Sequence, residues 1–156
     1  MASDLLPADL VIRPATPDDA AALAALRWRW AVPDRPPRED ELDEFTRELR
    51  RWMAERRDRS VCTIAVLGDE LVGMAWLAVF ERAPNPGDIV RRSGDVQSVF
   101  VLPEHQSRGI GRRLMDAVCA TADELGVRKL TLDARDQAVP FYERLGFAAR
   151  SSLMQR

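Results

Sequence analysis

The chain has few of the residues that build metal sites and disulfides. Its 156 residues include only two cysteines and one histidine. Cys62 and Cys119 lie on separate apolar segments and lack the close spacing of metal ligands, which predicts two reduced, buried thiols. The sequence therefore predicts neither a metal site nor a disulfide framework.

Long apolar runs and a strong charge of one sign are absent as well. No stretch of about eighteen apolar residues occurs, and the start Met1-Ala2-Ser3-Asp4 has no basic segment. We therefore expect no membrane span and no secretory signal, with a cytoplasmic location as the default. The net charge of −2 argues against a general nucleic-acid binder. The 22 arginines against one lysine suggest a genome of high GC content, and a bacterial-type protein is the default.

The composition is that of one folded unit. Hydrophobic residues make up 46% and charged residues 31% of the chain, which is enough apolar surface to build a core without disulfides. No internal repeat, low-complexity tract or linker interrupts the sequence. We therefore predict a single domain over residues 1–156.

Hydrophobic periodicity and turn residues predict the order β-α-α-β-β-β-α-β-α-β. Thr16-Pro17-Asp18-Asp19 has the features of a helix start, and Gly68-Asp69 those of a hairpin turn. A segment rich in Pro, Gly and charge, 81–94, is expected to be a loop and a candidate lid. The predicted strands are 10–13, 61–67, 71–80, 96–102, 129–134 and 152–154, and the predicted helices begin near 16, 38, 110 and 140.

The most informative segment is the turn Gln106-Ser107-Arg108-Gly109-Ile110-Gly111. It lies between an apolar strand and an amphipathic helical pattern, so it resembles a helix start that binds an anion. The first N–H groups of a helix are unpaired and carry the positive end of its dipole. Glycine removes the Cβ that would keep a phosphate away from the backbone. An ordinary strand-to-helix turn is the alternative for this motif alone.

A second segment, Phe141-Tyr142-Glu143-Arg144-Leu145-Gly146-Phe147, follows the next predicted strand. Together the two segments resemble the GNAT superfamily of N-acetyltransferases, whose acetyl-CoA signature is Q/R-x-x-G-x-G/A and whose C-terminal part contains F-Y-E-x-L-G-F. The resemblance is strong from Asp95 to Phe147 and weak before residue 60. It implies an α+β fold with a mixed, mostly antiparallel central sheet flanked by helices, which agrees with the predicted element order.

The resemblance also implies how acetyl-CoA would bind. In the family the strand before the glycine turn splays from its neighbour, and the pantetheine arm lies in the opening against main-chain atoms. The turn then holds the pyrophosphate, mainly through its backbone, with polar or cationic side chains adding contacts. Val99 and Val101 can place their side chains in the core and still contact the coenzyme through main-chain atoms. The implied coenzyme-binding residues are Val99, Val101, Gln106, Ser107, Arg108, Gly109, Ile110, Gly111 and Arg112.

Tyr142 is the only tyrosine, and the resemblance places it where the family commonly has the general acid beside the coenzyme sulfur. Its phenol is protonated at neutral pH and can donate. The alternative is a packed aromatic with its hydroxyl hydrogen-bonded. No glutamate matches the family's frequent base, so Asp95, or a water held by Gln97 or Ser98, is the candidate. His105 is expected to be an exposed loop residue, with a coenzyme contact as the alternative.

The implied function is an acetyl-CoA-dependent N-acetyltransferase that transfers acetyl to a primary amine by direct attack in a ternary complex. A small-molecule acceptor is favoured, and a protein N-terminus or a lysine is the alternative. A CoA-binding sensor or interaction protein without turnover is a further alternative, because the glutamate is missing. Relatives of this architecture often form dimers, so a homodimer is a possible state of this protein. No metal, nucleic acid or membrane is implied.

The acceptor side falls in the region that the resemblance covers least. Trp28, Trp30 and Trp52, together with the acidic residues between 39 and 44, would suit a cationic amine with an apolar part. The favoured alternative is a stripe of core aromatics and a solvated helix start whose acids offset the helix dipole. The sequence does not identify the acceptor.

Overall fold

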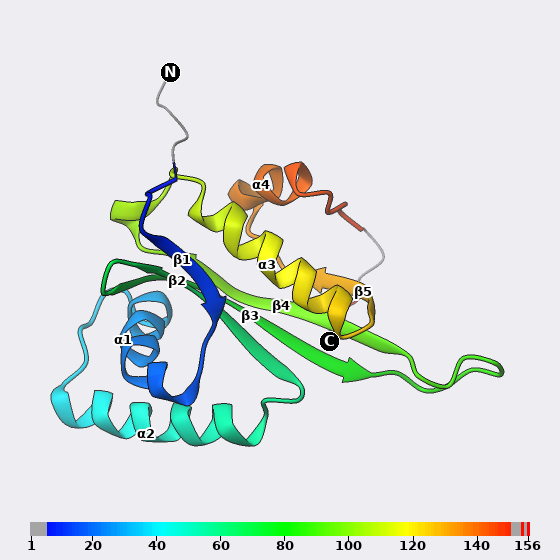
Figure 1. The fold of residues 1–156 in the computed structure, drawn as a ribbon, viewed down its shortest axis with the longest axis horizontal. Helices are drawn as coiled ribbons and strands as arrows, with labels where there is room; N and C mark the ends of the chain where they lie inside the picture. The colour runs from blue at the N-terminus through cyan, green and yellow to red at the C-terminus, as the bar shows by residue number, and fades with distance from the viewer. Residues whose placement is uncertain (1–5, 151–153, 155) are drawn as a thin grey trace.

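A computed structural model describes residues 6–150, 154 and 156. All of its strands belong to one sheet in the order β1-β2-β3-β4-β5 (Figure 1). The first four pair antiparallel, and β5 pairs parallel to β4. This confirms the predicted mixed, mostly antiparallel sheet. The strands are β1 (Leu10–Pro14), β2 (Ser60–Leu67), β3 (Glu70–Glu81), β4 (Arg92–Val101) and β5 (Val127–Leu132).

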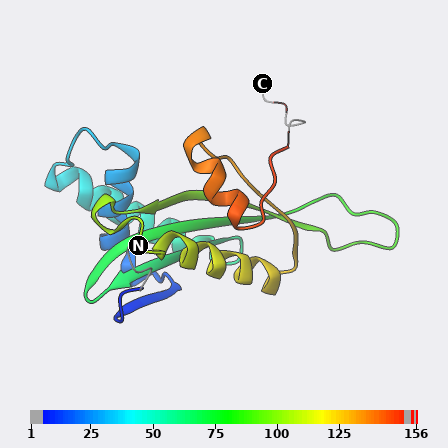
Figure 2. The ribbon, with the colours of Figure 1, turned by 90° about the horizontal axis from the view of Figure 1, so that it is seen from above.

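Helices cover both faces of this sheet (Figures 1 and 2). Side chains alternate between the faces of a strand, and β3 shows which helix lies on which side. An ideal Cβ on Gly73 would lie 3.0 Å from Leu114 of α3, whereas Trp76 packs on Trp52 of α2. The helices are α1 (Ala20–Ala31), α2 (Glu39–Glu55), α3 (Ile110–Glu124) and the short α4 (Val139–Arg144).

The predicted amphipathic stripes form the core. On α3 the buried residues recur at helical spacing, at Ile110, Leu114, Met115, Val118 and Ala122. They pack against β2 and β3, because this helix crosses the middle of the sheet (Figure 1). No helix within the described ranges is long and apolar enough to span a bilayer.

Three expectations about the chain need correction. The segment 81–94 is not a loop throughout: β3 continues to Glu81 and β4 begins at Arg92, and only 82–91 connects them. Figure 1 shows this hairpin extending away from the rest of the sheet. Cys62 is buried as predicted, but Cys119 is partly exposed. Of the last predicted strand, residues 152–153 lie outside the described residues, and Met154 is not in a strand.

The start of the first helical segment is held by an ion pair. Asp19 receives hydrogen bonds of 2.8 Å from both terminal nitrogens of Arg13 on β1 and one of 2.8 Å from the Thr16 N–H. The contact joins the edge strand to the short 3-10 turn Pro17–Asp19 before α1. The Asp19 side chain is 16% exposed but the Arg13 side chain is 42% exposed, so water screens this pair in part.

This pair predicts an acid-sensitive part of the stability. Hydrogen bonding to Arg13 lowers the pKa of Asp19 from 3.8 to about 2. A lowered folded-state pKa stabilises the protein above the unfolded value, and that stability is lost as the pH falls from about 4 towards 2. We expect Asp19→Asn to remove about 1–2 kcal/mol at pH 7. Denaturant unfolding from pH 7 to 2 should show the difference from wild type shrinking with acid; parallel profiles would contradict it.

Candidate active site

The sheet opens between β4 and β5. Their ladder ends at the pair Val96↔Leu132, where β5 also ends, whereas β4 continues to Val101. In the described part of the chain no strand pairs with residues 97–101 on that side. The opening lies where the resemblance predicted it, and Val99 and Val101 are within it. Such an edge presents main-chain groups to an extended ligand.

A β-bulge lies at the start of this opening. Between the pairs Met74↔Phe100 and Trp76↔Gln97, β3 advances by two residues and β4 by three. The extra residue bends the strand and raises its twist. Ser98 in this segment has φ 52°, a left-handed conformation that costs a residue with a Cβ some strain. The bulge thus turns β4 at the point where it leaves β5.

The glycine turn follows β4 after the short 3-10 turn Pro103–His105 and leads into α3. Gly109 is the N-cap residue of α3, with φ 76°, and Ser107 has φ 60°. Glycine adopts a positive φ without the strain that a Cβ causes, so the backbone conformation itself favours glycine at position 109. Gly111 is different, because an ideal Cβ there would lie 3.5 Å from the Phe141 ring, an ordinary contact. The first N–H groups of α3 have no partner within the helix, which is the geometry of an anion site.

The side chains of the turn divide into two groups. Gln106 donates to the Val101 carbonyl at 3.0 Å, so its side-chain amide braces the turn against β4, and the Val101 oxygen is already engaged. Arg108 and Arg112 are exposed, and Arg112 lies 4.0 Å from Asp116 one turn along the helix. These two guanidinium groups are the cations nearest in sequence to the unpaired N–H groups of the helix start.

Tyr142 lies on α4, beside the start of α3. Its ring makes edge-on contacts with Phe141 and Phe147, with centroids 5.0 and 6.0 Å away. Phe141 in turn approaches Gly111. Burial raises the pKa of the Tyr142 phenol above 10, so the hydroxyl stays protonated at neutral pH. Among the described residues no group accepts a hydrogen bond from it, which leaves it available to a ligand.

The candidate base lies in a small polar network on β4. Gln97 donates to Asp95 at 2.9 Å, and the Thr131 hydroxyl lies 3.4 Å from the other carboxylate oxygen. Asp95 therefore orients the Gln97 amide. Thr131 was not singled out in the sequence, because a threonine in a strand is an ordinary β-former.

A cavity of about 580 Å³ lies on the face of the sheet covered by α1 and α2. Gln97 lines this cavity and is also the first β4 residue beyond the last β4–β5 pair. The cavity therefore adjoins the opening between β4 and β5 at Gln97. The other lining residues are Arg27, Phe45, Glu48, Leu49, Arg51, Trp52, Glu55, Arg56 and Trp76.

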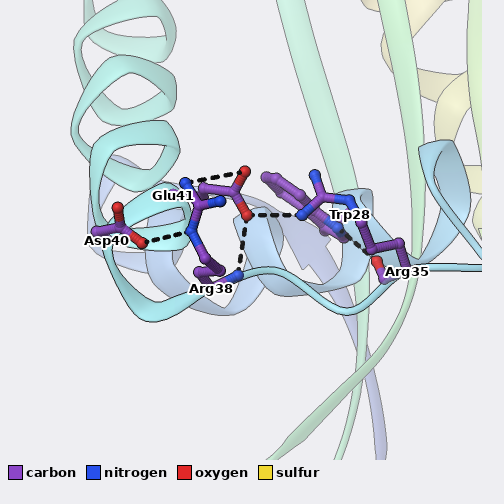
Figure 3. Close-up of polar contacts among 5 residues, drawn as sticks. All are labelled: Trp28, Arg35, Arg38, Asp40 and Glu41. Carbon is purple, nitrogen blue, oxygen red and sulfur yellow. Dashed lines mark hydrogen bonds and ion pairs between the residues drawn. The ribbon is translucent and has the colours of Figure 1, made fainter.

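The acidic cluster at the start of α2 lies elsewhere (Figure 3). Glu41 accepts hydrogen bonds from Arg35 at 2.7 Å and from the Arg38 N–H at 3.0 Å, and Asp40 pairs with Arg38. The hydrogen bond from Arg35 lowers the pKa of Glu41 to about 2. Trp28 donates to the Arg35 carbonyl at 2.9 Å. The cluster caps a helix and does not line the cavity, which agrees with the solvated helix start. The expected stripe of core aromatics is wrong, because Trp30 and Trp52 are 37% and 38% exposed.

His105 was expected to be an exposed loop residue, and the structure corrects this. Its side chain is 15% exposed, and Nε2 lies 3.6 Å from the Glu70 carboxylate. Nδ1 is buried without a partner among the described residues. His105 packs at the base of the turn between β4 and α3, inside a 3-10 turn that the sequence pattern did not predict.

Comparisons with known proteins agree with this geometry. Aminoglycoside N(6')-acetyltransferase type 1 of Stenotrophomonas maltophilia is 33% identical over 129 residues, which cover 82% of this chain and 77% of that protein. Glucosamine 6-phosphate N-acetyltransferase of Trypanosoma brucei brucei is 32% identical over 85 residues, 54% of this chain. That match spans just over half of the relative, 56% of its length.

Solved structures share the fold. An acetyltransferase from Trypanosoma brucei superposes with a TM-score of 0.73 and 25% identity, covering 95% of this chain and 99% of that one. A predicted acetyltransferase with acetyl-CoA from Clostridium acetobutylicum gives a TM-score of 0.75 at 22% identity, covering 94% and 95%. The family model described as Acetyltransferase (GNAT) family matches residues 22–147. The chain therefore belongs to the GNAT family of acetyltransferases.

Proposed function

We propose that the protein, as a single domain over residues 1–156, is an acetyl-CoA-dependent N-acetyltransferase that acts on a primary amine by direct attack. The opening between β4 and β5 carries this proposal, because it adjoins both a helix N-terminus suited to phosphate and a separate cavity. A coenzyme and an acceptor can thus approach Gln97 from two sides. The named relatives act on aminoglycosides and glucosamine 6-phosphate, which favours a small-molecule amine here.

The residues around the opening fit acetyl-CoA. The edge of β4 at Val99 and Val101 has no partner strand and suits an extended pantetheine arm, with the Val101 oxygen shared with Gln106. The left-handed turn at Ser107 and Gly109 leads to the unpaired N–H groups at the start of α3. A pyrophosphate there would gain these donors and the helix dipole. The proposed coenzyme-binding residues are Val99, Val101, Gln106, Ser107, Arg108, Gly109, Ile110, Gly111 and Arg112, with Gln106 acting through its bond to Val101.

The chain's own groups would handle the protons. Bound acetyl-CoA would supply a thioester whose C–S bond breaks as the C–N bond to the amine forms. The attacking nitrogen must lose a proton, for which we propose Asp95, or a water held by Gln97 or Ser98. The departing thiolate must gain one, for which we propose the hydroxyl of Tyr142. Tyr142 is suited to donate because burial keeps it protonated.

Two alternatives differ in what would be observed. A protein N-terminus or a lysine as acceptor would use the same opening with a different occupant of the cavity. A CoA-binding sensor would bind the coenzyme and release no thiol with any amine, and the polar network at Asp95, which contains no glutamate, is what favours it. A cytoplasmic location, a bacterial origin and a homodimer stay predictions from the sequence.

A calorimetric titration with acetyl-CoA tests the proposal first. We expect saturable binding, followed by amine-dependent release of the CoA thiol with a panel of small primary amines and peptides. The panel should distinguish small-molecule from peptide acceptors by rate. Binding without thiol release for every amine would support the sensor. A folded protein that does not bind acetyl-CoA would overturn the acetyltransferase.

A further inference from the structure

The cavity on the α1 and α2 face contains a guanidinium without a carboxylate partner. Arg27 projects from α1, and its central carbon lies 5.3 Å from the Trp30 ring centroid and 5.5 Å from that of Trp76. Among the described residues none accepts a hydrogen bond or forms an ion pair with it. The side chain is half-buried, and this desolvation lowers its pKa. Aromatic faces attract the charge but accept no N–H hydrogen bond in the plane of the guanidinium, so the five N–H donors are left to water or to a ligand.

The indole N–H of Trp76 is a second donor without a partner, on a side chain that lines this cavity and also a smaller one beside Cys62. Trp76 is 5% exposed and lines the cavity, and its Nε1 has no partner among the described residues. An unpaired buried donor is destabilising. Because Arg27 stacks on this same ring, both donors lie in one region. The Nε1 atom has almost no exposed surface, so an acceptor oxygen of a ligand bound at Arg27 reaches it only when the side chains around it shift.

The remaining charges in the cavity do not supply this partner. Arg51 and Arg56 add positive charge, and Glu48 and Glu55 add negative charge. Arg56 lies 3.5 Å from Glu55 and 5.1 Å from the Trp52 ring, so these two charges offset each other. The residues that line the cavity include three arginines and two glutamates, which gives a net charge of +1. The cavity thus favours an anion.

We propose that the acceptor is a primary amine that carries a carboxylate or a phosphate, and that the Arg27 guanidinium and the Trp76 indole N–H bind this anionic group. The inference rests on the proposed acetyltransferase function. An anion held there lies in the same cavity as Gln97, which adjoins the coenzyme opening. The amine end of the acceptor would then face Gln97, and the tryptophan walls would contact its apolar part. Arg27 and Trp76 would be specificity-determining residues.

Matched acceptor pairs test the proposal. Glucosamine 6-phosphate against glucosamine isolates a phosphate, and phenylalanine against phenylalaninamide isolates a carboxylate. We expect kcat/KM to be about 10- to 100-fold higher for the anionic member of at least one pair, as a charge-assisted hydrogen bond provides. The pair that shows the preference identifies the anion. Equal rates within both pairs, or a preference for the neutral members, would overturn the proposal.

Variants identify the residues. Arg27→Met should raise KM for the anionic acceptor at least about tenfold, remove the preference and leave kcat nearly unchanged. Arg27→Lys should keep part of the preference, and Trp76→Phe should reduce it while keeping the ring. Arg47→Met, at an exposed site on α2 outside the cavity, is the matched control. Equal loss for both members of a pair in Arg27→Met would assign Arg27 a packing role only.

A binding measurement without the coenzyme separates this inference from the function it rests on. Trp52 and Trp76 line the cavity, so titration of benzoate and phenyl phosphate should change the intrinsic fluorescence saturably, and Arg27→Met should weaken that binding. Acetyl-CoA titration of the same samples checks the fold and the coenzyme site. If wild type binds the anions but not acetyl-CoA, only the proposed acetyltransferase function is contradicted. Anion binding that is absent, or unchanged in Arg27→Met, would overturn the anion site.

Discussion

Replacing Tyr142 by phenylalanine should lower kcat by about 100-fold or more and leave the affinity for acetyl-CoA unchanged. General acid catalysis contributes about 10²- to 10⁴-fold, and the substitution removes only the hydroxyl. The ring contacts with Phe141 and Phe147 remain. Because no described residue accepts from the hydroxyl, its loss leaves no buried group unpaired. The variant should therefore be as stable as wild type.

Initial rates and calorimetry on the same samples measure both quantities. Tyr142→Leu provides the comparison for packing, since it loses the aromatic contacts and should lower the melting temperature, whereas Tyr142→Phe should not. A Tyr142→Phe enzyme with wild-type kcat would show that the residue only packs, and another group or water would then protonate the leaving thiolate.

Replacing Gly109 by glutamate should weaken acetyl-CoA binding by about 100-fold or more. The change adds a side chain at φ 76° and places a carboxylate at the N-terminus of α3, where the pyrophosphate is proposed to bind. The strain in a left-handed residue costs roughly 1–2 kcal/mol of stability. The loss of binding is a separate effect, because like charges repel strongly at a site that depends on the helix dipole.

Gly126→Glu is the matched control for this strain. Gly126 follows the other end of α3 with φ 70°, and nothing lies within 4 Å of an ideal Cβ there. Both variants carry the same charge change and a similar left-handed strain, but only Gly109 is at the proposed cradle. A Cβ at Gly109 would also lie 3.3 Å from the Leu6 side chain, so Gly109→Ala is needed to measure that steric effect by itself. Gly111→Glu adds the charge without a positive φ. Equal acetyl-CoA affinity in Gly109→Glu and Gly126→Glu would contradict a phosphate site at this helix start.

Local patterns predicted the elements of the coenzyme side. The stripe of α3, the glycine turn before it and the hairpin turn at Gly68 depend on residues close together in the chain, so periodicity and glycine positions were informative. The left-handed conformation of Gly109 was seen only in the structure. The hairpin 82–91 was predicted poorly, because its strands are extended by cross-strand pairing such as Arg82 N–H to the Arg91 carbonyl at 2.8 Å. Pairing partners overrode the local Pro and Gly signals.

The sequence by itself determined the fold class, the order of elements and the coenzyme motif, because these follow from short-range spacing and from family motifs. The tertiary structure decided the acceptor side. The three tryptophans chosen from α1 and α2 included only one that lines the cavity, while Arg27 and Trp76 were overlooked. The contact between Arg27 and Trp76 joins α1 to β3, two elements that are separated in the sequence by all of α2 and β2. Whether a donor is satisfied depends on such long-range packing, which residue spacing does not encode.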